Sequence, residues 1–346
     1  MHLDNPSGRI VRLTRMRSLS LVLLCSLGVA SAAQSSAPLT LAKTIALKSV
    51  VGRFDHFAFD PATNRLFVAA TGNHSVEIVN ITDGEVTEHI TGLGKPHGLA
   101  WIDGKLFVAD GTLAALKIYS GSPLKLVASL PLSDDADDMV YDPSTKLLYV
   151  GHGGSSAAVP GRVAVVNAES STLVANLPTS AHPEALEIDP EGKRIFANIA
   201  DSGEIVVVDA VTHTIAATWK LTRAKDNVPV TYDSDDHALI IGCRTPPRAV
   251  SLDSISGKEI SDLPSASGAD DLFYEPSSHR AYLIAGTGSI DVYQVAPDKS
   301  LKALGSVKTG PGAKTGLLVP SIRALFIAVP ADGATSAQIR IYKTAP

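Results

Sequence analysis

The stretch from His56 to Ile90 contains four similar segments: it reads HFAFDP over 56–61, RLFVAA over 65–70, SVEIVN over 75–80 and VTEHI over 86–90. Each segment is short and rich in β-branched and aromatic residues, which is typical of β-strands. Turn-forming residues such as Asp, Pro, Gly and Asn separate the segments. The stretch therefore predicts four consecutive strands joined by short turns.

The same unit returns along the chain. The residue that ends the first strand recurs at intervals of 39 to 47 residues, and in order it is Asp60, Asp103, Asp142, Asp189, Asp233, Glu275 and Val319. The second strands repeat as LFVA over 106–109, LYVG over 148–151, IFAN over 195–198, LIIG over 239–242, YLIA over 282–285 and LFIA over 325–328. The chain is therefore built from seven copies of one unit of about 43 residues.

Units of this length with four strands each are typical of propeller blades. We predict an all-β, seven-bladed β-propeller with four antiparallel strands per blade, formed by one domain over 34–346. The blades are expected at 52–92, 93–133, 134–179, 180–223, 224–265, 266–309 and 310–346. The last copy lacks a fourth strand, and an extra strand at 44–50 precedes the first copy. We expect this strand to complete the seventh blade and close the ring, which leaves no open seam for edge pairing.

The first 33 residues are expected to be a signal peptide. Arg9, Arg12, Arg15 and Arg17 precede an apolar run from Leu19 to Val29, and small residues follow for cleavage after Ala32 or Ala33. We therefore expect a periplasmic or secreted, monomeric chain without a membrane span. Cleavage removes four of the 30 basic and one of the 35 acidic residues, which leaves a net charge of −8 that disfavours nucleic acid as a partner. Cys243 then remains alone, so an intramolecular disulfide is excluded.

Two segments carry a family resemblance. RIFANIADSGEIVVVD over 194–209 and LFVAATGNHSVEIVN over 66–80 each combine a second strand, a short Asn/Gly/Ser loop and a third strand. Over about residues 44–344 the chain resembles the YVTN-repeat, YncE-like β-propellers, a WD40-like repeat architecture without the Trp-Asp signature. The resemblance implies the fold and a binding or scaffold role; such repeats also occur beside periplasmic quinone- or haem-dependent oxidation systems. It does not specify an activity, because one fold hosts many functions.

A candidate site follows from aligning the loops that enter each first strand, which surround one mouth of the central channel in propellers of this kind. The first aligned position holds Asp55, Pro96, Asp137, Glu184, Val228, Asp270 and Lys314, and the next holds His56, His97, Asp138, Ala185, Pro229, Asp271 and Thr315. The ligand-binding candidates are Asp55, His56, His97, Asp137, Asp138, Glu184, Asp270, Asp271 and Lys314. The loops between the second and third strands open on the same face and add His74, Asp110, His152, Asn198, Asp201 and Arg244, and His182 enters with blade four.

Three interpretations of this mouth stay open. Carboxylates and histidines that converge on one axis suit a divalent metal, with His56, His97, Asp138 and Asp271 as candidate ligands. The same residues also suit a small polar molecule or a protein partner. A rim of loop acids that holds channel water explains them equally well. We expect a non-catalytic binding or scaffold protein; the alternative is a metal-dependent, lactonase- or lyase-like enzyme in which His56 or His97 acts as the base.

Overall fold

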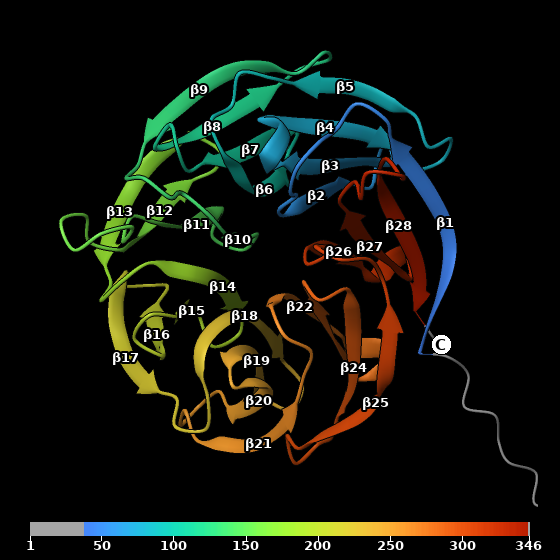
Figure 1. The fold of residues 1–346 in the computed structure, drawn as a ribbon. Helices are drawn as coiled ribbons and strands as arrows, with labels where there is room; N and C mark the ends of the chain where they lie inside the picture. The colour runs from blue at the N-terminus through green and yellow to red at the C-terminus, as the bar shows by residue number, and fades with distance from the viewer. Residues whose placement is uncertain (1–37, 345–346) are drawn as a thin grey trace, which may run out of the picture. The chain divides into compact units, whose positions relative to one another are not determined.

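The computed structural model describes residues 38–344, which form seven four-stranded antiparallel sheets. The sheets are arranged as the blades of a ring around a central channel (Figure 1). The helical elements of the described residues are three short 3₁₀ turns, η1 (Thr71–Asn73), η2 (Pro276–Ser278) and η3 (Pro320–Ile322). The predicted seven-bladed propeller is confirmed. The predicted signal peptide over 1–33 lies outside the described residues.

In this part of the chain, no helix is both long enough and apolar enough to cross a lipid bilayer.

Blades one to three each run from an inner strand at the channel to an outer strand. Blade one contains β2 (Phe57–Asp60), β3 (Arg65–Ala70), β4 (Ser75–Asn80) and β5 (Val86–Ile90). Blade two contains β6 (Pro96–Ile102), β7 (Lys105–Asp110), β8 (Ala115–Ser120) and β9 (Lys125–Pro131). Blade three contains β10 (Met139–Asp142), β11 (Leu147–His152), β12 (Arg162–Asn167) and β13 (Thr172–Pro178).

Blades four to six follow the same order. Blade four contains β14 (Pro183–Asp189), β15 (Arg194–Ile199), β16 (Glu204–Asp209) and β17 (Thr214–Lys220). Blade five contains β18 (Lys225–Asp233), β19 (Ala238–Thr245), β20 (Pro247–Asp253) and β21 (Glu259–Pro264). Blade six contains β22 (Ala269–Glu275), β23 (Arg280–Ala285), β24 (Ser289–Val295) and β25 (Leu301–Lys308).

The seventh blade joins the two ends of the propeller. It contains β26 (Gly316–Val319), β27 (Ala324–Val329), β28 (Ala337–Thr344) and, as its outer strand, β1 (Leu39–Leu47). β1 pairs antiparallel with β28 from Leu39 opposite Thr344 to Leu47 opposite Ala337. The expected closing strand is therefore present. Its bounds differ from the predicted 44–50, because pairing with β28 starts at Leu39 and ends at Leu47, where a turn begins.

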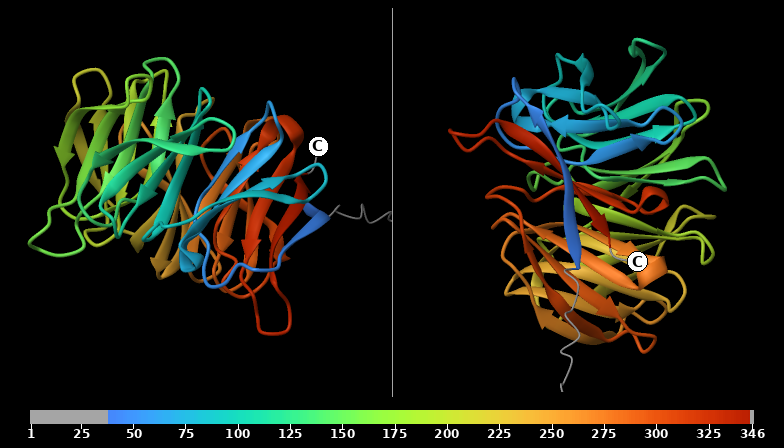
Figure 2. Two further views of the ribbon diagram at one scale, coloured as in Figure 1. Left: turned by 90° about the horizontal axis from the view of Figure 1, so that it is seen from above. Right: turned by 90° about the vertical axis from the view of Figure 1, so that its right-hand side faces the viewer.

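The core lies between neighbouring blades. The second and third strands are buried on both faces, as in β3 and β4 of blade one, because each blade is covered by the blades before and after it. The outer strands are half exposed; β9 and β17 alternate between exposed and half-buried residues. Side views show the blades packed face against face, with loops gathered at both ends of the strands (Figure 2). This packing makes the strands a rigid frame for the loops at the channel mouth.

Candidate functional site

The loops that enter the first strands are fixed to the frame by main-chain hydrogen bonds. In blade one, Asp55 N donates to Ala69 O at 2.8 Å, and in blade three, Asp137 N donates to Gly151 O at 2.9 Å. The shared pairing makes Asp55 and Asp137 equivalent positions of the repeat, as the alignment predicts. Side-chain bonds also join neighbouring blades, since Thr71 Oγ1 donates to Pro96 O at 2.6 Å.

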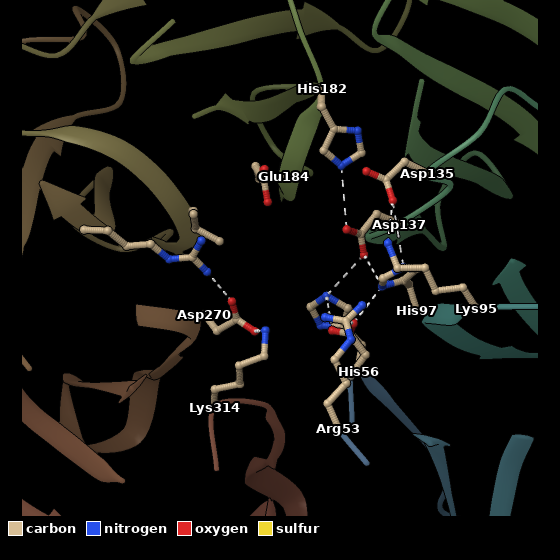
Figure 3. Close-up of a pocket in the computed structure, with 13 residues that line it drawn as sticks. Arg53, His56, Lys95, His97, Asp135, Asp137, His182, Glu184, Asp270 and Lys314 are labelled. Atoms are coloured by element: carbon tan, nitrogen blue, oxygen red, sulfur yellow. Dashed lines mark hydrogen bonds and ion pairs between the residues drawn. The ribbon is translucent and has the colours of Figure 1, made fainter. Parts of the chain in front are cut away.

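These loops enclose a cavity of about 210 Å³, which we call the mouth cavity (Figure 3). Its lining residues are Arg53, Asp55, His56, Lys95, His97, Asp135, Asp137, His182, Glu184, Val228, Arg244, Asp270 and Lys314. Nearly all of them are ionisable, and both signs of charge are present. A cavity of this size holds a few water molecules, whose share of liquid volume is about 30 Å³ each, or one small polar ligand.

A second cavity of about 260 Å³, the inner cavity, shares His56 and Asp270 with the mouth cavity. Asp138, Glu187 and Asp271 line it together with apolar side chains such as Phe57 and Leu272. The structure therefore brings seven of the predicted residues to the mouth cavity, namely Asp55, His56, His97, Asp137, Glu184, Asp270 and Lys314. It places the other two, Asp138 and Asp271, in the inner cavity.

One side of the mouth cavity, which we call the histidine half, contains Asp55, His56, His97, Asp137 and His182. His97 lies between the two carboxylates: its Nδ1 is 2.6 Å from Asp55 Oδ2 and 3.4 Å from Asp137 Oδ1. Because an ionised carboxylate can only accept, Nδ1 of His97 donates to Asp55. The His97 side chain is 4% exposed, and its Nε2 has no hydrogen-bond partner among the described residues.

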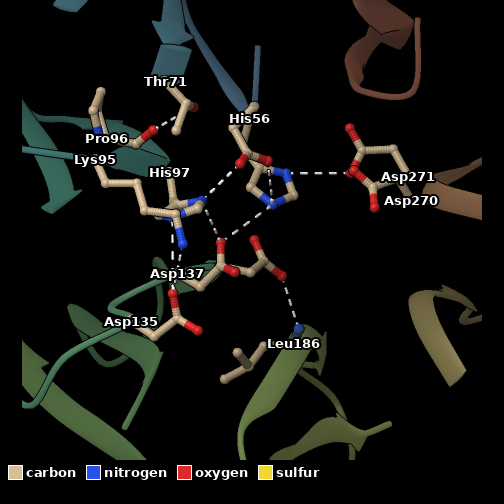
Figure 4. A network of polar contacts seen from close by, with 12 residues as sticks. His56, Thr71, Lys95, Pro96, His97, Asp135, Asp137, Leu186, Asp270 and Asp271 are labelled. Carbon is tan, nitrogen blue, oxygen red and sulfur yellow. Dashed lines mark hydrogen bonds and ion pairs between the residues drawn. The ribbon is translucent and has the colours of Figure 1, made fainter. Parts of the chain in front are cut away.

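Asp137 is the centre of the histidine half, because imidazoles approach both of its oxygens. His56 Nε2 lies 3.9 Å from Oδ1, a contact that Figure 4 shows, and His182 Nε2 lies 3.6 Å from Oδ2. His56 Nε2 is also 3.7 Å from Asp55 Oδ1. These separations exceed the length of a good hydrogen bond, which is about 2.7–3.2 Å. Among residues 38–344, no lysine or arginine nitrogen lies within 4.0 Å of Asp137.

The two imidazoles that face Asp137 are each held in place by an acceptor on the other ring nitrogen. His182 Nδ1 lies 2.6 Å from Gly153 O, and a carbonyl accepts, so this nitrogen carries the proton. His56 Nδ1 lies 3.2 Å from Asp271 Oδ1, across the channel in blade six. Asp271 is held in turn by Gly316 N, which donates to Oδ2 at 2.7 Å. Both rings therefore present Nε2 to the mouth cavity.

Gly98 allows the Asp137 backbone to approach blade two. A Cβ at this position would lie 2.2 Å from Asp137 O, a distance that atoms of this kind do not adopt. Any larger residue at 98 would displace the loop that carries Asp137. The glycine is thus part of the site although it has no side chain.

The opposite side of the cavity, the salt-bridged half, contains Arg244, Asp270 and Lys314. Arg244 donates to Asp270 Oδ1 and, through Nε, to Ala269 O at 2.8 Å. Lys314 Nζ lies 2.5 Å from Asp270 Oδ2. Both oxygens of this carboxylate are therefore neutralised by permanent cations.

Burial and neighbouring charges shift several pKa values in the two cavities. Burial lowers the pKa of His182, but the contact with the negatively charged Asp137 carboxylate outweighs this and raises the pKa to about 9. The pKa of His56 is raised well above its ordinary value, because Asp271 and Asp138 outweigh the effect of burial. Burial raises the pKa of Asp138 to about 6 and that of Glu187 to about 7. The carboxylates of the two cavities thus attract positive charge to the histidine half. Protons on the histidines supply this charge in the absence of another cation.

Alignment of two positions missed several lining residues. Arg53 and Asp135 lie two residues before the first aligned position of their blades, and Lys95 lies one before it. Extending the alignment by two residues would have found them. Lys95 and Arg53 also bring positive charge to a mouth whose aligned positions are mostly acidic: Lys95 Nζ is 3.0 Å from Asp135 Oδ1, and Arg53 Nη1 is 3.8 Å from Asp55 Oδ2.

Residues of the second loop set divide between the cavity and the frame. Arg244 lines the mouth cavity. Asp110 accepts from the main-chain nitrogens of Gly94 and Lys95 at 2.9 Å, and thereby shapes a loop rather than a ligand site. His152 bonds to Ser133 N at 2.9 Å and to Asn176 Oδ1 at 3.0 Å. The remaining members, outside the mouth-cavity lining, are His74, Asn198 and Asp201.

Comparison with known proteins supports the fold. No protein-family model matches this chain, and no curated protein sequence is similar to it. A chain of Kuenenia stuttgartiensis hydrazine synthase superposes with a TM-score of 0.74 at 16% identity, covering 86% of this chain and 97% of that one. A chain of a mitotic checkpoint complex gives a TM-score of 0.74 at 13% identity, covering 96% of this chain and 100% of that one. At such identities the likeness shows the β-propeller fold alone.

Proposed function

We propose that this chain is a binding protein whose channel mouth holds a divalent transition-metal ion between Asp55, His56 and Asp137. The propeller fold suits a binding or scaffold role in general. One observation carries the metal assignment: His56 Nε2 faces two carboxylates at 3.7 and 3.9 Å, with no hydrogen bond of normal length joining them. One ligand atom from each of the three residues lies within 4.8 Å of the others.

The distances from His56 Nε2 to the two carboxylates suit a bound metal ion better than a hydrogen bond. Metal–ligand bonds of 2.0–2.2 Å in a tetrahedral site put neighbouring ligand atoms about 3.3–3.6 Å apart. The His56–carboxylate separations are slightly longer than this, so a small inward movement of the side chains would complete the coordination. One imidazole with two carboxylates favours Zn²⁺, Cu²⁺ or Fe²⁺ over Ca²⁺, which prefers oxygen ligands alone.

The surroundings of His56 resemble those of metal-binding histidines in general. Such histidines donate their second ring N–H to a carboxylate or carbonyl, which fixes the ring and its tautomer. Asp271 occupies that position at 3.2 Å from His56 Nδ1. His97 likewise fixes a proposed ligand, because its Nδ1 donates to Asp55 Oδ2 at 2.6 Å. Two of the predicted metal ligands, Asp271 and His97, are therefore proposed as positioning residues, and Asp138 belongs to the inner cavity.

The proposal is tested by removing metal from the purified chain with a chelator and titrating it with Zn²⁺ in a calorimeter. We expect saturable binding whose affinity falls by more than about 100-fold in His56→Ala. Loss of a residue that only hydrogen-bonds a metal ligand typically lowers metal affinity by about 10–100-fold, and loss of the ligand itself should lower it further. His213→Asn is the matched control, since this half-buried histidine lies in the turn between β16 and β17, outside the mouth-cavity lining and outside the groups of metal-type ligands. Absence of Zn²⁺ binding by the wild-type chain would contradict the proposal.

A metal-dependent enzyme is the second candidate, and the inner cavity favours it. Asp138 and Glu187, with pKa values near 6 and 7, line this cavity together with His56. Carboxyl groups that exchange protons near neutral pH are suited to general acid–base catalysis beside a metal. Hydrolysis of a panel of lactones by the Zn²⁺-loaded chain, and its loss in Asp138→Asn, would support this candidate over simple binding.

We also propose that the chain is a periplasmic or secreted member of the YVTN-repeat, YncE-like propellers. The repeats over 66–80 and 194–209 support the family, and the basic and apolar segments before Ala33 support export. N-terminal sequencing of the chain recovered from the periplasm of an expressing bacterium tests export. The expected N-terminus is Ala33 or Gln34, and an intact cytoplasmic chain would refute export.

A further inference from the structure

The mouth cavity contains a second group of metal-type ligands beside the first. Asp137, His182 and Glu184 each offer one ligand atom, and these atoms lie within 4.8 Å of one another. Asp137 therefore belongs to two groups, with Asp55 and His56 on one side and with His182 and Glu184 on the other. Each group has one imidazole, one carboxylate of its own and the shared carboxylate.

We propose that the mouth holds a pair of divalent transition-metal ions bridged by the Asp137 carboxylate. The first ion binds Asp137 Oδ1, His56 Nε2 and Asp55; the second binds Asp137 Oδ2, His182 Nε2 and Glu184. The inference rests on the proposed metal function of the first group and adds a second ion to it. The open positions of both ions face the mouth cavity, where a small anionic ligand would complete their coordination.

His182 supplies an independent observation for the second ion. Its side chain is 9% exposed, and its Nε2 has no hydrogen-bond partner among the described residues. The ring is not free to turn away, because Nδ1 is committed to Gly153 O at 2.6 Å. Gly153 and Gly154 have positive φ angles of 71° and 84°, a conformation that brings this loop back to His182. The buried Nε2 thus lies 3.6 Å from a carboxylate oxygen without a hydrogen bond between them, and a metal ion that replaces the proton on Nε2 would join the two atoms.

The two oxygens of Asp137 are used separately, which suits a bridge. His56 approaches Oδ1 and His182 approaches Oδ2 (Figure 3 shows the two rings on either side of Asp137). A carboxylate that binds one ion through each oxygen holds the ions about 3.5–4 Å apart, the spacing of two-metal sites in general. Asp270, the equivalent residue of blade six, has both oxygens occupied by Arg244 and Lys314 and offers no such bridge.

The stoichiometry of the full-length chain tests the pair. After loading with Zn²⁺ and dialysis, elemental analysis is expected to find two ions per chain, falling to one in Glu184→Gln. Asp201→Asn is the matched control, since Asp201 is an exposed acid in the neighbouring loop of blade four. Loading with Cu²⁺ adds a second readout, because two coupled Cu²⁺ ions give a half-field EPR transition that a single ion lacks. We expect this transition in the wild type and its loss in Glu184→Gln, with folding of each variant checked by circular dichroism.

The outcomes separate this inference from the proposed function. One ion in the wild type, unchanged in Glu184→Gln, would overturn the pair and leave the first site intact. No ion in the wild type would overturn both. A third cluster, Asp233, Asp236 and His279, lies at the turns after the first strands of blades five and six, and its ligand atoms also lie within 4.8 Å of one another. Two ions that fall to one in Asp236→Asn would therefore assign the second ion to that cluster and overturn the pair.

Discussion

Asp137 and Asp270 occupy the same position of the repeat, in blades three and six, yet their surroundings differ. Asp270 lies between Arg244 and Lys314, whose positive charges are permanent. Asp137 lies among His56, His97 and His182, whose charges depend on protons or on a metal. The frame beneath both residues is alike, since each lies at the start of the first strand of a four-stranded blade: Asp137 just before β10 and Asp270 in β22, directly after Ala269.

The frame therefore sets where a carboxylate lies, while the neighbouring loops determine which groups neutralise it. A carboxylate paired with Arg and Lys is satisfied within the protein and has little affinity left for a cation. A carboxylate surrounded by oriented imidazoles keeps that affinity. The histidine half is therefore the part of the mouth where we expect metal, and the salt-bridged half is its internal control.

Asp137→Asn is expected to have the largest effect. It removes a ligand charge from both groups, so Zn²⁺ affinity should fall by more than about 100-fold. Asp270→Asn makes the same chemical change in the other half and should alter Zn²⁺ affinity by less than about threefold. Calorimetric titration of both variants checks the contrast. Equal losses in the two variants would show that the mouth acts through its overall charge and not through a defined site.

Asp271→Asn should have an intermediate effect. The amide keeps the size of the side chain but weakens the acceptor for His56 Nδ1, so the ring loses its fixed orientation and some basicity. We expect Zn²⁺ affinity to fall by about 10–100-fold, as for other residues behind metal ligands. Because Asp271 also accepts from Gly316 N, a melting curve should accompany the titration. Unchanged affinity would remove Asp271 from the site.

Lys314→Met tests the salt-bridged half through stability. The variant leaves Asp270 with Arg244 alone, in a partly buried position, and should lower the free energy of unfolding by about 1–2 kcal/mol. Zn²⁺ affinity at the histidine half should change by less than about threefold. Urea unfolding and calorimetry measure the two quantities. A large gain in Zn²⁺ binding would mean that Lys314 competes with the metal and that the two halves are not separate.

Glu187→Gln should have the smallest effect, and the effect should depend on pH. Burial raises the pKa of Glu187 to about 7 in the folded chain, so the folded state holds the proton more tightly than the unfolded state. The destabilising contribution is absent below the unfolded pKa of about 4.3 and complete above about pH 7. Because channel solvent reaches the group, we expect Glu187→Gln to stabilise the chain by about 1 kcal/mol at pH 8 and to have little effect at pH 4. Equal stabilisation at both pH values would contradict this account of Glu187.

The fold could be predicted from the sequence because every blade repeats the same local signals. The strands at 65–70, 75–80 and 86–90 have their predicted bounds, since apolar runs and turn residues mark both ends. The closing strand was predicted less well. Its bounds are set by pairing with β28, which includes a bulge between Leu41 and Lys43 that no local pattern reveals.

The candidate site could be predicted in part. Alignment of the repeat brings Asp55, His56, Asp137 and Glu184 together, because equivalent loops of a ring converge on one mouth. The contact of His56 with Asp271 joins blades one and six and depends on the width of the channel, which the sequence does not encode locally. The same holds for the use of Gly153 O as the acceptor for His182. Side-chain direction likewise determines whether an acid contacts histidines or a lysine and an arginine, and the alignment does not reveal it.

Anomalous diffraction at the zinc absorption edge, from crystals of the Zn²⁺-loaded chain, tests the proposed metal site most directly. The proposed metal site predicts a peak in the mouth cavity within bonding distance of His56 Nε2, Asp55 and Asp137, and none beside Asp270. A mouth without a peak, or zinc found at the turns around Asp233 and His279 alone, would contradict it.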